Sequence, residues 1–354
     1  MQPYSSPKEI KVGVLGYGGA FNMGKSHLDQ MKKAGMTPFA VCEIDPARLE
    51  VAKDDFPGIE TYGSLDAMLK KSDVDLIVHI TPHNLHYPLA AKCLKAGKHV
   101  VTEKPFVVTT READKLIDLA EKHDVMVSTY HNRHWDGWIL RARREIEKGA
   151  VGEVTRVQLR FGGYSMPREW WRTSKSISGG VMYDWGVHLL EYALQVVPGN
   201  ITEVAGFAHT GHWEAKAGKS SPYFGDFNED EATAIVRFDT GAMIDLRISQ
   251  LEPTAQPPMT IFGTGGAYVV ERFFGKDESP EWTLHKADKQ GRIKTSTGNH
   301  LKGKQHLFYT NVAEHLCGDT DLIITPQWAR RPIHILDLAD RSARQGKALR
   351  AKYG

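Results

Sequence analysis

The first residues of the chain contain the pattern that most constrains its fold: an apolar strand, a glycine-rich turn and a helix, in that order. Residues 8–15 form the apolar stretch, the turn is Gly16-Tyr17-Gly18-Gly19, and a helical pattern follows at residues 26–33. The backbone of such a turn can approach a pyrophosphate, and the N–H groups and dipole at the helix start favour its negative charge. The pattern predicts a dinucleotide-binding unit with Gly16, Gly18 and Gly19 at the cofactor.

The turn departs from the usual G-x-G-x-x-G spacing. Phe21 occupies the third small position, and the next glycine is Gly24. We expect a longer turn, and we place Phe21 beside the glycines among the cofactor-binding residues. Taken alone, such a loose glycine cluster also fits an ordinary turn, so the prediction depends on the segments that follow.

The second strand pattern, residues 37–42, ends in Glu43. This is about the distance from the turn at which an acidic residue binds the adenosine ribose hydroxyls. Because Ile44 follows it, where a basic residue would accommodate a 2′-phosphate, Glu43 favours NAD over NADP. Asp45 and Pro46 are typical of a helix N-cap followed by proline in the first turn.

Strand and helix patterns continue to alternate after this point. Apolar strand patterns at residues 74–80 and 99–102 flank a helical run at residues 88–96. Continuous apolar strands that alternate with helices predict a parallel sheet covered on both faces, that is, an α/β Rossmann domain. Ligands bind at the carboxyl ends of such strands. The residues that follow these two strands are Thr81, Pro82, Glu103 and Lys104.

Several short motifs follow one another in a recognisable order. They are Thr81-Pro82, Gly97-Lys98-His99-Val100, Glu103-Lys104-Pro105, Asp184-Trp185-Gly186-Val187-His188 and Ser342-Ala343-Arg344-Gln345-Gly346-Lys347. In these motifs and their spacing the chain resembles, over nearly its whole length, the Gfo/Idh/MocA oxidoreductases. That family includes inositol dehydrogenases and glucose-fructose oxidoreductase.

The resemblance implies that Lys104 reaches both the substrate and the nicotinamide, and that the Lys104-Pro105 peptide bond is cis. The positions of Thr81, Pro82, Glu103 and His86 after the strands place them on the cofactor side. The resemblance makes His86 a helix-entry residue, for which a structural role is the alternative. Without the flanking motifs, Lys104 would fit a solvated lysine beside a turn proline equally well.

A second chemical centre lies in residues 178–188, which open an apolar helical run. Asp184 and His188 are four residues apart and would share one face of a helix. Imidazole suits the removal of a hydroxyl proton because its pKa lies near neutrality. By resemblance, His188 is the catalytic acid/base, Asp184 binds and orients substrate hydroxyls, and Lys104 assists. A surface pair and a metal-binding pair are the alternatives, but no further ligand spacing supports a metal, so we predict none.

Candidate substrate-binding residues occur before this centre. Asn132 lies where the chain crosses between the two expected domains. Aromatic and guanidinium groups gather in the loop that follows, and they suit a sugar ring and its hydroxyls. The candidates are Asn132, Tyr164, Arg168, Trp171, Arg172 and Asp184. A packed loop or an interface explains the same residues, and Arg172 also suits an anionic group.

We expect two domains, a dinucleotide-binding domain at residues 1–129 and a substrate-binding and oligomerisation domain at residues 130–354. Alternating strand patterns predict an α+β second domain with a mostly antiparallel, open-faced sheet and a hairpin turn at residues 239–241. The strand patterns are at residues 154–161, 201–208, 232–238, 242–250 and 259–262. Residues 210–229 look like a long surface loop, and the C-terminal helices, residues 307–316 and 327–344, should pack back near the first domain.

Composition excludes several other classes of protein. With 354 residues and 41% hydrophobic content the chain can bury two cores. A formal charge of +2 gives no reason to expect nucleic acid or a membrane as partner. Three scattered cysteines and the lack of a signal-peptide pattern predict a cytoplasmic protein. The resemblance implies a homodimer or homotetramer formed through the open sheet face.

The function expected from these features is that of an NAD-dependent oxidoreductase acting on CH–OH groups. It would interconvert a secondary alcohol and its ketone on a sugar, cyclitol or glycoside. One alternative is an NAD-dependent glycosidase that oxidises a sugar transiently, eliminates the aglycone and reduces the product again. Another alternative is a non-catalytic NAD(H)-binding regulator, against which the presence of Lys104 and His188 argues.

Overall fold

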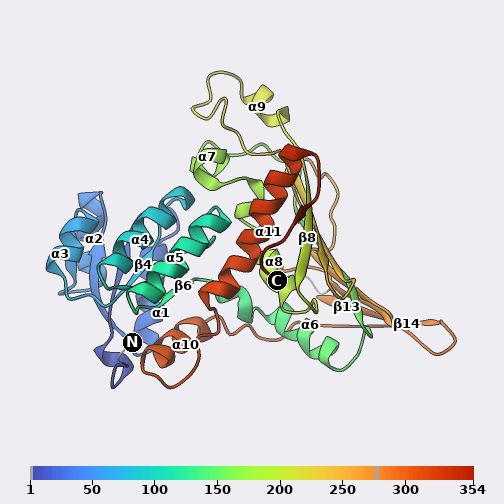
Figure 1. The fold of residues 1–354 in the computed structure, drawn as a ribbon, viewed down its shortest axis with the longest axis horizontal. Helices are drawn as coiled ribbons and strands as arrows, with labels where there is room; N and C mark the ends of the chain where they lie inside the picture. The colour runs from blue at the N-terminus through green and yellow to red at the C-terminus, as the bar shows by residue number, and fades with distance from the viewer. Residues whose placement is uncertain (1–2, 276–278) are drawn as a thin grey trace. The chain divides into compact units, whose positions relative to one another are not determined.

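The computed structural model describes residues 3–275 and 279–354 (Figure 1). The chain divides into two compact units. The first contains the residues up to Asn132 together with His306–Arg330, and the second contains Arg133–Gln305 and Arg331–Gly354. Helix α11 (Pro326–Gln345) therefore contributes residues to both units. Each unit has its own sheet and core.

The first unit contains a six-stranded, entirely parallel sheet with the strand order β3-β2-β1-β4-β5-β6. This is the strand order of a dinucleotide-binding Rossmann fold, and it confirms the predicted fold class. The strands are β1 (Lys11–Leu15), β2 (Thr37–Cys42), β3 (Glu60–Tyr62), β4 (Leu76–His79), β5 (His99–Thr102) and β6 (Val127–Thr129). Strands β4 and β5 are buried along their whole length, as expected of a sheet covered on both faces.

Helices connect the parallel strands, and several begin with a side-chain cap. Asp45 accepts a hydrogen bond from the Ala47 N–H at the start of α2, and Thr109 and Glu112 form a capping box at α5. The helices of this unit are α1 (Met23–Lys33), α2 (Pro46–Asp55), α3 (Leu65–Lys71), α4 (His86–Lys95), α5 (Thr110–Lys122) and α10 (Leu307–Leu316).

The first strand is shorter than the sequence indicated. Pro7–Glu9 forms a 3₁₀ turn, closed by the Ile10 N–H donating to the Pro7 carbonyl, so β1 begins only at Lys11. The proline fixes its own φ angle and has no N–H for a strand ladder, which explains the difference.

The second unit contains a nine-stranded sheet with the order β14-β13-β12-β11-β7-β10-β9-β8-β15. Strands β7 and β10 pair in parallel and all the other neighbours are antiparallel, as predicted for a mostly antiparallel sheet. The strands are β7 (Val154–Gly162), β8 (Ile201–His209), β9 (Glu231–Phe238), β10 (Met243–Ser249), β11 (Met259–Gly263), β12 (Gly266–Val270), β13 (Trp282–Ala287), β14 (Ile293–Gly298) and β15 (Leu349–Arg350). The hairpin between β9 and β10 turns at Gly241, where φ is +83°.

Helices cover one face of this sheet. Every residue of α8 (Gly186–Leu194) is buried, and α11 packs on β8 so closely that a Cβ at Gly206 would lie 1.9 Å from the Ala339 carbonyl oxygen. Figure 1 shows α8 and α11 beside this sheet. The remaining helices of the unit are α6 (Gly137–Glu147), α7 (Lys175–Ser178) and α9 (His212–Ala217).

Two sequence interpretations need correction here. The sheet continues into β12, β13 and β14, which were not among the predicted strands; β14 shows no alternation because it is exposed along nearly its whole length. The expected loop at residues 210–229 contains the helix α9, whose first N–H groups, those of His212 and Trp213, donate to the carboxylate of Asp230. Across the described ranges, no helix combines the length and apolar character needed to span a membrane.

Candidate active site

The glycine-rich turn lies at the carboxyl end of β1, in the first unit. Gly16 has a φ of +104°, and a Cβ there would lie 2.2 Å from the Ile80 carbonyl oxygen, so no other residue fits. A Cβ at Gly18 would meet no atom within 4 Å, which leaves open space beside the turn. Phe21 is 60% exposed.

Gly24 takes the part of the third glycine of the fingerprint, although it was not among the predicted site residues. A Cβ there would lie 2.8 Å from the Gly16 carbonyl oxygen and 2.6 Å from the Tyr17 ring. Gly24 therefore lets α1 pack directly on the turn, and the helix begins at Met23 rather than near residue 26. In the sequence, the only indication of this role is that Gly24 is the next glycine after the turn.

Glu43 lies at the end of β2, and its carboxylate is held against the glycine turn. It accepts hydrogen bonds from three backbone N–H groups, those of Tyr17 at 2.6 Å, Ile44 at 2.7 Å and Asp45 at 3.1 Å. Arg48 also contacts the same turn. Its Nε donates to the Tyr17 carbonyl at 2.9 Å, and a Cβ at Gly19 would lie 3.4 Å from its Nη1. The structure thus adds a cation that sequence reasoning had missed.

Thr81 and Pro82 follow β4. The Thr81 hydroxyl is buried, and it has no hydrogen-bond partner within the part of the chain that the structure describes. Such an orphaned polar atom at the carboxyl end of a parallel strand suits a ligand that would satisfy it. Pro82 precedes a 3₁₀ turn, His83–Leu85, that leads into α4.

His86 lies in the first turn of α4 and is fully buried. Its Nδ1 is 2.7 Å from the Pro105 carbonyl oxygen, and its Nε2 is 3.0 Å from the Thr81 carbonyl oxygen. Burial lowers its pKa, although the hydrogen bonds to the two carbonyls act in the opposite direction. His86 thereby connects the turns that follow β4 and β5.

Glu103 and Lys104 follow β5, and the Lys104-Pro105 peptide bond is cis, as the resemblance implied. The Glu103 carboxylate accepts from the Lys104 N–H at 3.0 Å and lies 2.9 Å from Nε2 of the buried His27. His27 Nδ1 in turn lies 2.6 Å from the Tyr309 hydroxyl. Burial alone would raise the pKa of Glu103. His27 and Lys104 together lower that pKa by more than burial raises it, so the net shift is downward. Glu103 is therefore a charged group that fixes the backbone at Lys104.

These features fit a dinucleotide. The backbone at Gly18 is unobstructed, and the Glu43 carboxylate lies just after β2. The buried Thr81 hydroxyl could form a hydrogen bond with a ligand. The residues that would hold the cofactor come from the ends of β1, β2, β4 and β5, where Rossmann domains bind nucleotides.

The second unit contains the other predicted catalytic residues. His188 lies in the first turn of α8, is 5% exposed, and its ring is 5.6 Å from that of Trp185. Asp184 is half-buried and precedes the helix, between the 3₁₀ turn Val181–Tyr183 and the N-cap residue Trp185. The expectation that Asp184 and His188 share one helix is therefore wrong, because α8 begins only at Gly186.

Asp184 is paired with Arg172. Arg172 Nη1 donates to Asp184 Oδ1 at 2.9 Å, and both side chains remain partly exposed, at 24% and 34%. The Arg172 guanidinium also lies over two indole rings, 4.9 Å from Trp170 and 5.1 Å from Trp171. The structure thus brings together three of the predicted residues, Trp171, Arg172 and Asp184.

The other predicted substrate residues have different surroundings. Asn132 belongs to the first unit and begins the 3₁₀ turn Asn132–Trp135. Tyr164 is 54% exposed, and its ring packs 5.3 Å from that of Trp213 on α9. Arg168 is exposed, and its carbonyl accepts from the Thr173 hydroxyl at 2.5 Å.

Buried polar contacts on α8 were not apparent from the sequence. Glu191, 1% exposed, pairs with His134, and Tyr192 donates to the buried carboxylate of Asp136 at 2.7 Å. Burial raises the pKa of Asp136. These contacts fix the helix that carries His188 to residues 134–136. In the sequence, the only indication of these contacts is the number of polar residues at 131–136.

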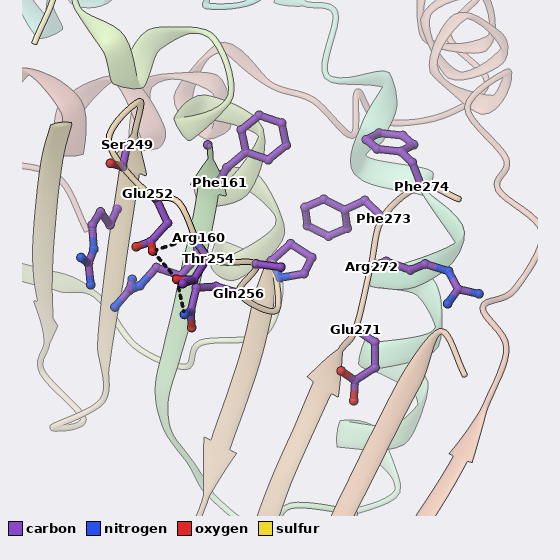
Figure 2. A pocket seen from close by; sticks show the side chains of 14 residues that line it. Arg160, Phe161, Ser249, Glu252, Thr254, Gln256, Glu271, Arg272, Phe273 and Phe274 are labelled. Atoms are coloured by element: carbon purple, nitrogen blue, oxygen red, sulfur yellow. Dashed lines mark hydrogen bonds between the residues drawn. The ribbon is translucent and has the colours of Figure 1, made fainter. Parts of the chain in front are cut away.

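A pocket of about 300 Å³ opens in the second unit at the end of β7 (Figure 2). Phe161 and Phe274 belong to its lining, and both rings also pack on Trp185, with centroids 4.2 Å and 5.8 Å away. Trp185 in turn contacts His188. None of the residues predicted to bind substrate lines this pocket. Among the described residues, no three His, Cys, Asp or Glu side chains are grouped so that they could hold a metal ion.

A Rossmann unit with an open glycine turn, followed by a unit with a buried histidine and a half-buried carboxylate, defines the class of two-domain nicotinamide-dependent oxidoreductases. Comparison with known families agrees. Residues 10–131 match the family described as "Oxidoreductase family, NAD-binding Rossmann fold", and residues 139–269 match the "GFO/IDH/MocA C-terminal domain". The chain belongs to the Gfo/Idh/MocA family of oxidoreductases.

Similar proteins include scyllo-inositol 2-dehydrogenase (NADP(+)) IolW of Bacillus subtilis, which is 25% identical over 97% of this chain and 96% of its own. Myo-inositol 2-dehydrogenase of Thermotoga maritima is 26% identical over 66% of each chain. Among solved structures, the WlbA dehydrogenase of Bordetella pertussis in complex with NADH and UDP-GlcNAcA has a TM-score of 0.76 and 22% identity, covering 96% of this chain and 98% of its own. That likeness shows the fold.

Proposed function

We propose that the protein is an NAD-dependent dehydrogenase that interconverts a secondary alcohol and its ketone on a neutral polyol, that is, a cyclitol, sugar or glycoside. The observation that carries this proposal is the Arg172–Asp184 pair, at 2.9 Å, because Asp184 lies four residues before the buried His188. The inositol dehydrogenases among the relatives support the same substrate class.

The proposed chemistry needs a group that takes the hydroxyl proton as the carbonyl forms. His188 is assigned that proton, because imidazole accepts and returns protons near neutral pH. Asp184 accepts hydrogen bonds from substrate hydroxyls and so orients the ring. Lys104 donates to the reacting oxygen, where its positive charge stabilises the developing negative charge. When bound, the nicotinamide takes the hydride from carbon or returns it.

The charge of Arg172 bears on the substrate class. Asp184 already neutralises the positive charge of the Arg172 guanidinium. A carboxylate or phosphate on the substrate would therefore have to compete with Asp184 for Arg172. A neutral vicinal diol instead finds both an acceptor and donors in the pair, and the indole faces of Trp170 and Trp171 suit the apolar face of a ring. We therefore propose neutral substrates rather than sugar acids or sugar phosphates.

The charged side chains at the glycine turn bear on the choice between NAD and NADP. Three backbone N–H groups hold the Glu43 carboxylate at the turn, so a 2′-phosphate would meet a fixed negative charge. Arg48 provides a nearby positive charge that lessens this penalty. We propose NAD as the preferred cofactor. Titration of NAD and NADP against the protein should give a lower Kd for NAD, and Glu43→Ser should reverse the order. Equal affinities in the unaltered protein would contradict the assignment.

The proposed reaction is tested by following the absorbance of NADH while NAD and the protein are offered cyclitols, free aldoses and aryl glycosides. NADH formation with one of these classes is the expected result. Release of the aglycone without NADH would instead favour the glycosidase cycle. Tight NAD binding without turnover of any class would favour a regulator.

We also propose that copies of the chain associate through the sheet face that the helices leave uncovered, as a homodimer or homotetramer. On β7, Arg156 and Gln158 are partly exposed and alternate with the buried Val157 and Leu159. Light scattering of the purified protein gives the test, and a monomer at working concentration would contradict the proposal.

A further inference from the structure

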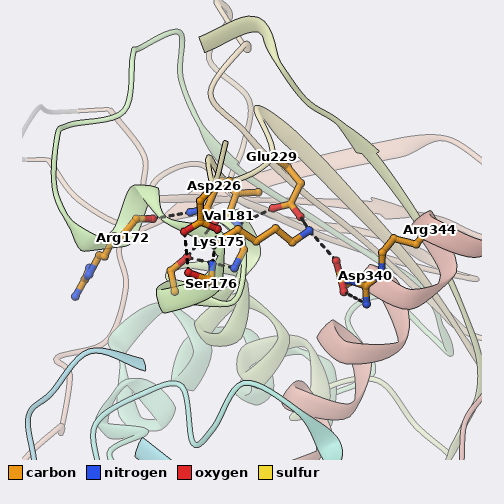
Figure 3. Close-up of polar contacts among 11 residues, drawn as sticks. Arg172, Lys175, Ser176, Val181, Asp226, Glu229, Asp340 and Arg344 are labelled. Carbon is orange, nitrogen blue, oxygen red and sulfur yellow. Dashed lines mark hydrogen bonds and ion pairs between the residues drawn. The ribbon is translucent and has the colours of Figure 1, made fainter. Parts of the chain in front are cut away.

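The segment between α9 and β9, residues 226–230, holds the chain that leads to His188; we name it the anchor segment. Asp226 accepts from the Ser176 N–H at 2.9 Å and from the Ser176 hydroxyl at 2.7 Å. Asn228 donates to the Arg172 carbonyl at 2.5 Å and accepts from the Ser178 hydroxyl at 3.0 Å. Figure 3 shows Asp226 beside Ser176 of α7.

Glu229 makes the contact nearest the catalytic candidates. Its side chain is 7% exposed, and Oε2 accepts a hydrogen bond from the Val181 N–H at 3.0 Å. Gly180 has a φ of +133°, and a Cβ there would lie 3.0 Å from the same oxygen. The carboxylate thus packs against bare backbone at Gly180 and fixes the first residue of the 3₁₀ turn Val181–Tyr183. Asp184 follows directly.

Lys175 holds Glu229 in place. Its ammonium pairs with Glu229 Oε1 and lies 2.9 Å from Asp340 Oδ1 on α11 (Figure 3). Arg344 pairs with the other oxygen of Asp340 at 2.6 Å. Without Lys175, two largely buried carboxylates would face each other with no cation between them, and Glu229 would be driven from its place.

We propose that Lys175 and Glu229 are positioning residues for the active site: the ion pair fixes the backbone at Gly180 and Val181, and thereby Asp184 and His188. This role rests on the proposed dehydrogenase function. Neither side chain needs to touch the substrate. A displacement of about 1 Å in a reacting group can lower a rate by about 100-fold, so the pair matters even at this distance.

The test compares Lys175→Met and Lys175→Arg with the unaltered protein. We expect Lys175→Met to lower kcat with the active polyol by about 10- to 100-fold. The Kd for NAD should not change, because the cofactor turn belongs to the first unit. Lys175→Arg keeps a cation with several donors for the two carboxylates and should recover most of kcat. Amide hydrogen exchange in residues 180–188 should be faster in Lys175→Met and near normal in Lys175→Arg.

A matched control separates positioning from a general loss of stability. Arg141 on α6 pairs with Glu145 at 3.3 Å, and it is about as buried as Lys175, at 23% against 33% exposure. Arg141→Met should lower the thermal midpoint without lowering kcat or changing exchange in residues 180–188. If Lys175→Met does not fold, Glu229→Gln replaces it, since it keeps the size of the side chain and removes its charge.

The outcomes are distinct. A kcat for Lys175→Met that falls no further than that of Arg141→Met overturns the positioning role, and so does failure of Lys175→Arg to recover kcat. Unchanged exchange in residues 180–188 overturns it as well. If the unaltered protein turns over none of the polyols, the proposed function itself fails, and the positioning role fails with it.

Discussion

In the first unit the groups that would meet a cofactor are mainly backbone atoms, exposed by glycines, whereas in the second unit the groups that would meet a substrate are side chains held by ion pairs. Gly16 and Gly24 are required by contacts of 2.2 Å and 2.6 Å that a Cβ would make. Asp184 is instead held by Arg172, and the backbone before it by Glu229 and Lys175. Steric exclusion therefore shapes the cofactor region, and charge pairing shapes the substrate region.

The largest effect should come from the second unit. We expect His188→Asn to lower kcat by about 100- to 10,000-fold, because the hydroxyl proton loses its acceptor. The Kd for NAD, measured by calorimetry, should stay the same. The control is His285→Asn on β13, a partly exposed histidine whose ring lies 3.1 Å from the Thr295 hydroxyl. A fall in kcat of similar size for both variants would remove His188 from the proposed mechanism.

In the first unit, a substitution at the glycine turn should weaken NAD binding. Gly16→Ala would force a residue with a Cβ to adopt a φ of +104° and would place that Cβ 2.2 Å from a carbonyl oxygen. We expect weaker NAD binding and a free energy of unfolding lower by about 1–3 kcal/mol or more. Gly63→Ala serves as the control, since a Cβ there meets no atom within 4 Å. NAD affinity equal to that of the unaltered protein would show that the turn is not the cofactor site.

Substitution of Arg172 sharpens the comparison within the substrate region. Arg172→Met should lower kcat/KM for neutral polyols by about 10- to 100-fold, the value of a hydrogen bond to a charged group, since Asp184 loses its partner. Arg172→Lys should be intermediate, because lysine retains the charge but not the planar fork over the indoles. If Arg172→Met instead abolished activity on sugar acids while sparing neutral polyols, Arg172 would be a receptor for anionic substrates.

The smallest effect concerns pH. The pKa of Glu103 is lowered in the folded protein relative to its ordinary value of 4.5, so its stabilising contribution is fully present above that value and is lost as the pH falls through the lowered pKa. Glu103→Gln should reduce stability by about 1–3 kcal/mol at pH 7 and by less at pH 3. Thermal midpoints at the two pH values give the comparison. An equal loss at both would show that the charge of Glu103 does not contribute.

The sequence predicted the first unit more completely than the second, for a physical reason. Alternating apolar runs and turn residues are local patterns, and β2 and β5 match the predicted ranges residue for residue. Gly24 is also visible in the sequence, because a position with no room for a Cβ must be occupied by glycine. The contacts of Glu103 with His27, and of His27 with Tyr309, join residues far apart in the chain and leave no such mark.

In the second unit the sequence identified the residue types but not their partners. Trp171, Arg172 and Asp184 were predicted, and they do lie together. Glu229 and Lys175 are 54 residues apart. The sequence placed Glu229 in an expected surface loop and predicted no role for Lys175. An ion pair has no periodicity, so its members become visible only when the fold brings them together.

The most direct test of the account offers the protein NAD and a polyol from the active class carrying deuterium at its ring carbons, and then analyses the reduced nicotinamide by mass spectrometry. Direct hydride transfer predicts one deuterium in each NADH formed, with an equal amount of ketone. Reduced nicotinamide whose new hydrogen comes from solvent, or an altered polyol without any label in the cofactor, would contradict the proposed dehydrogenase.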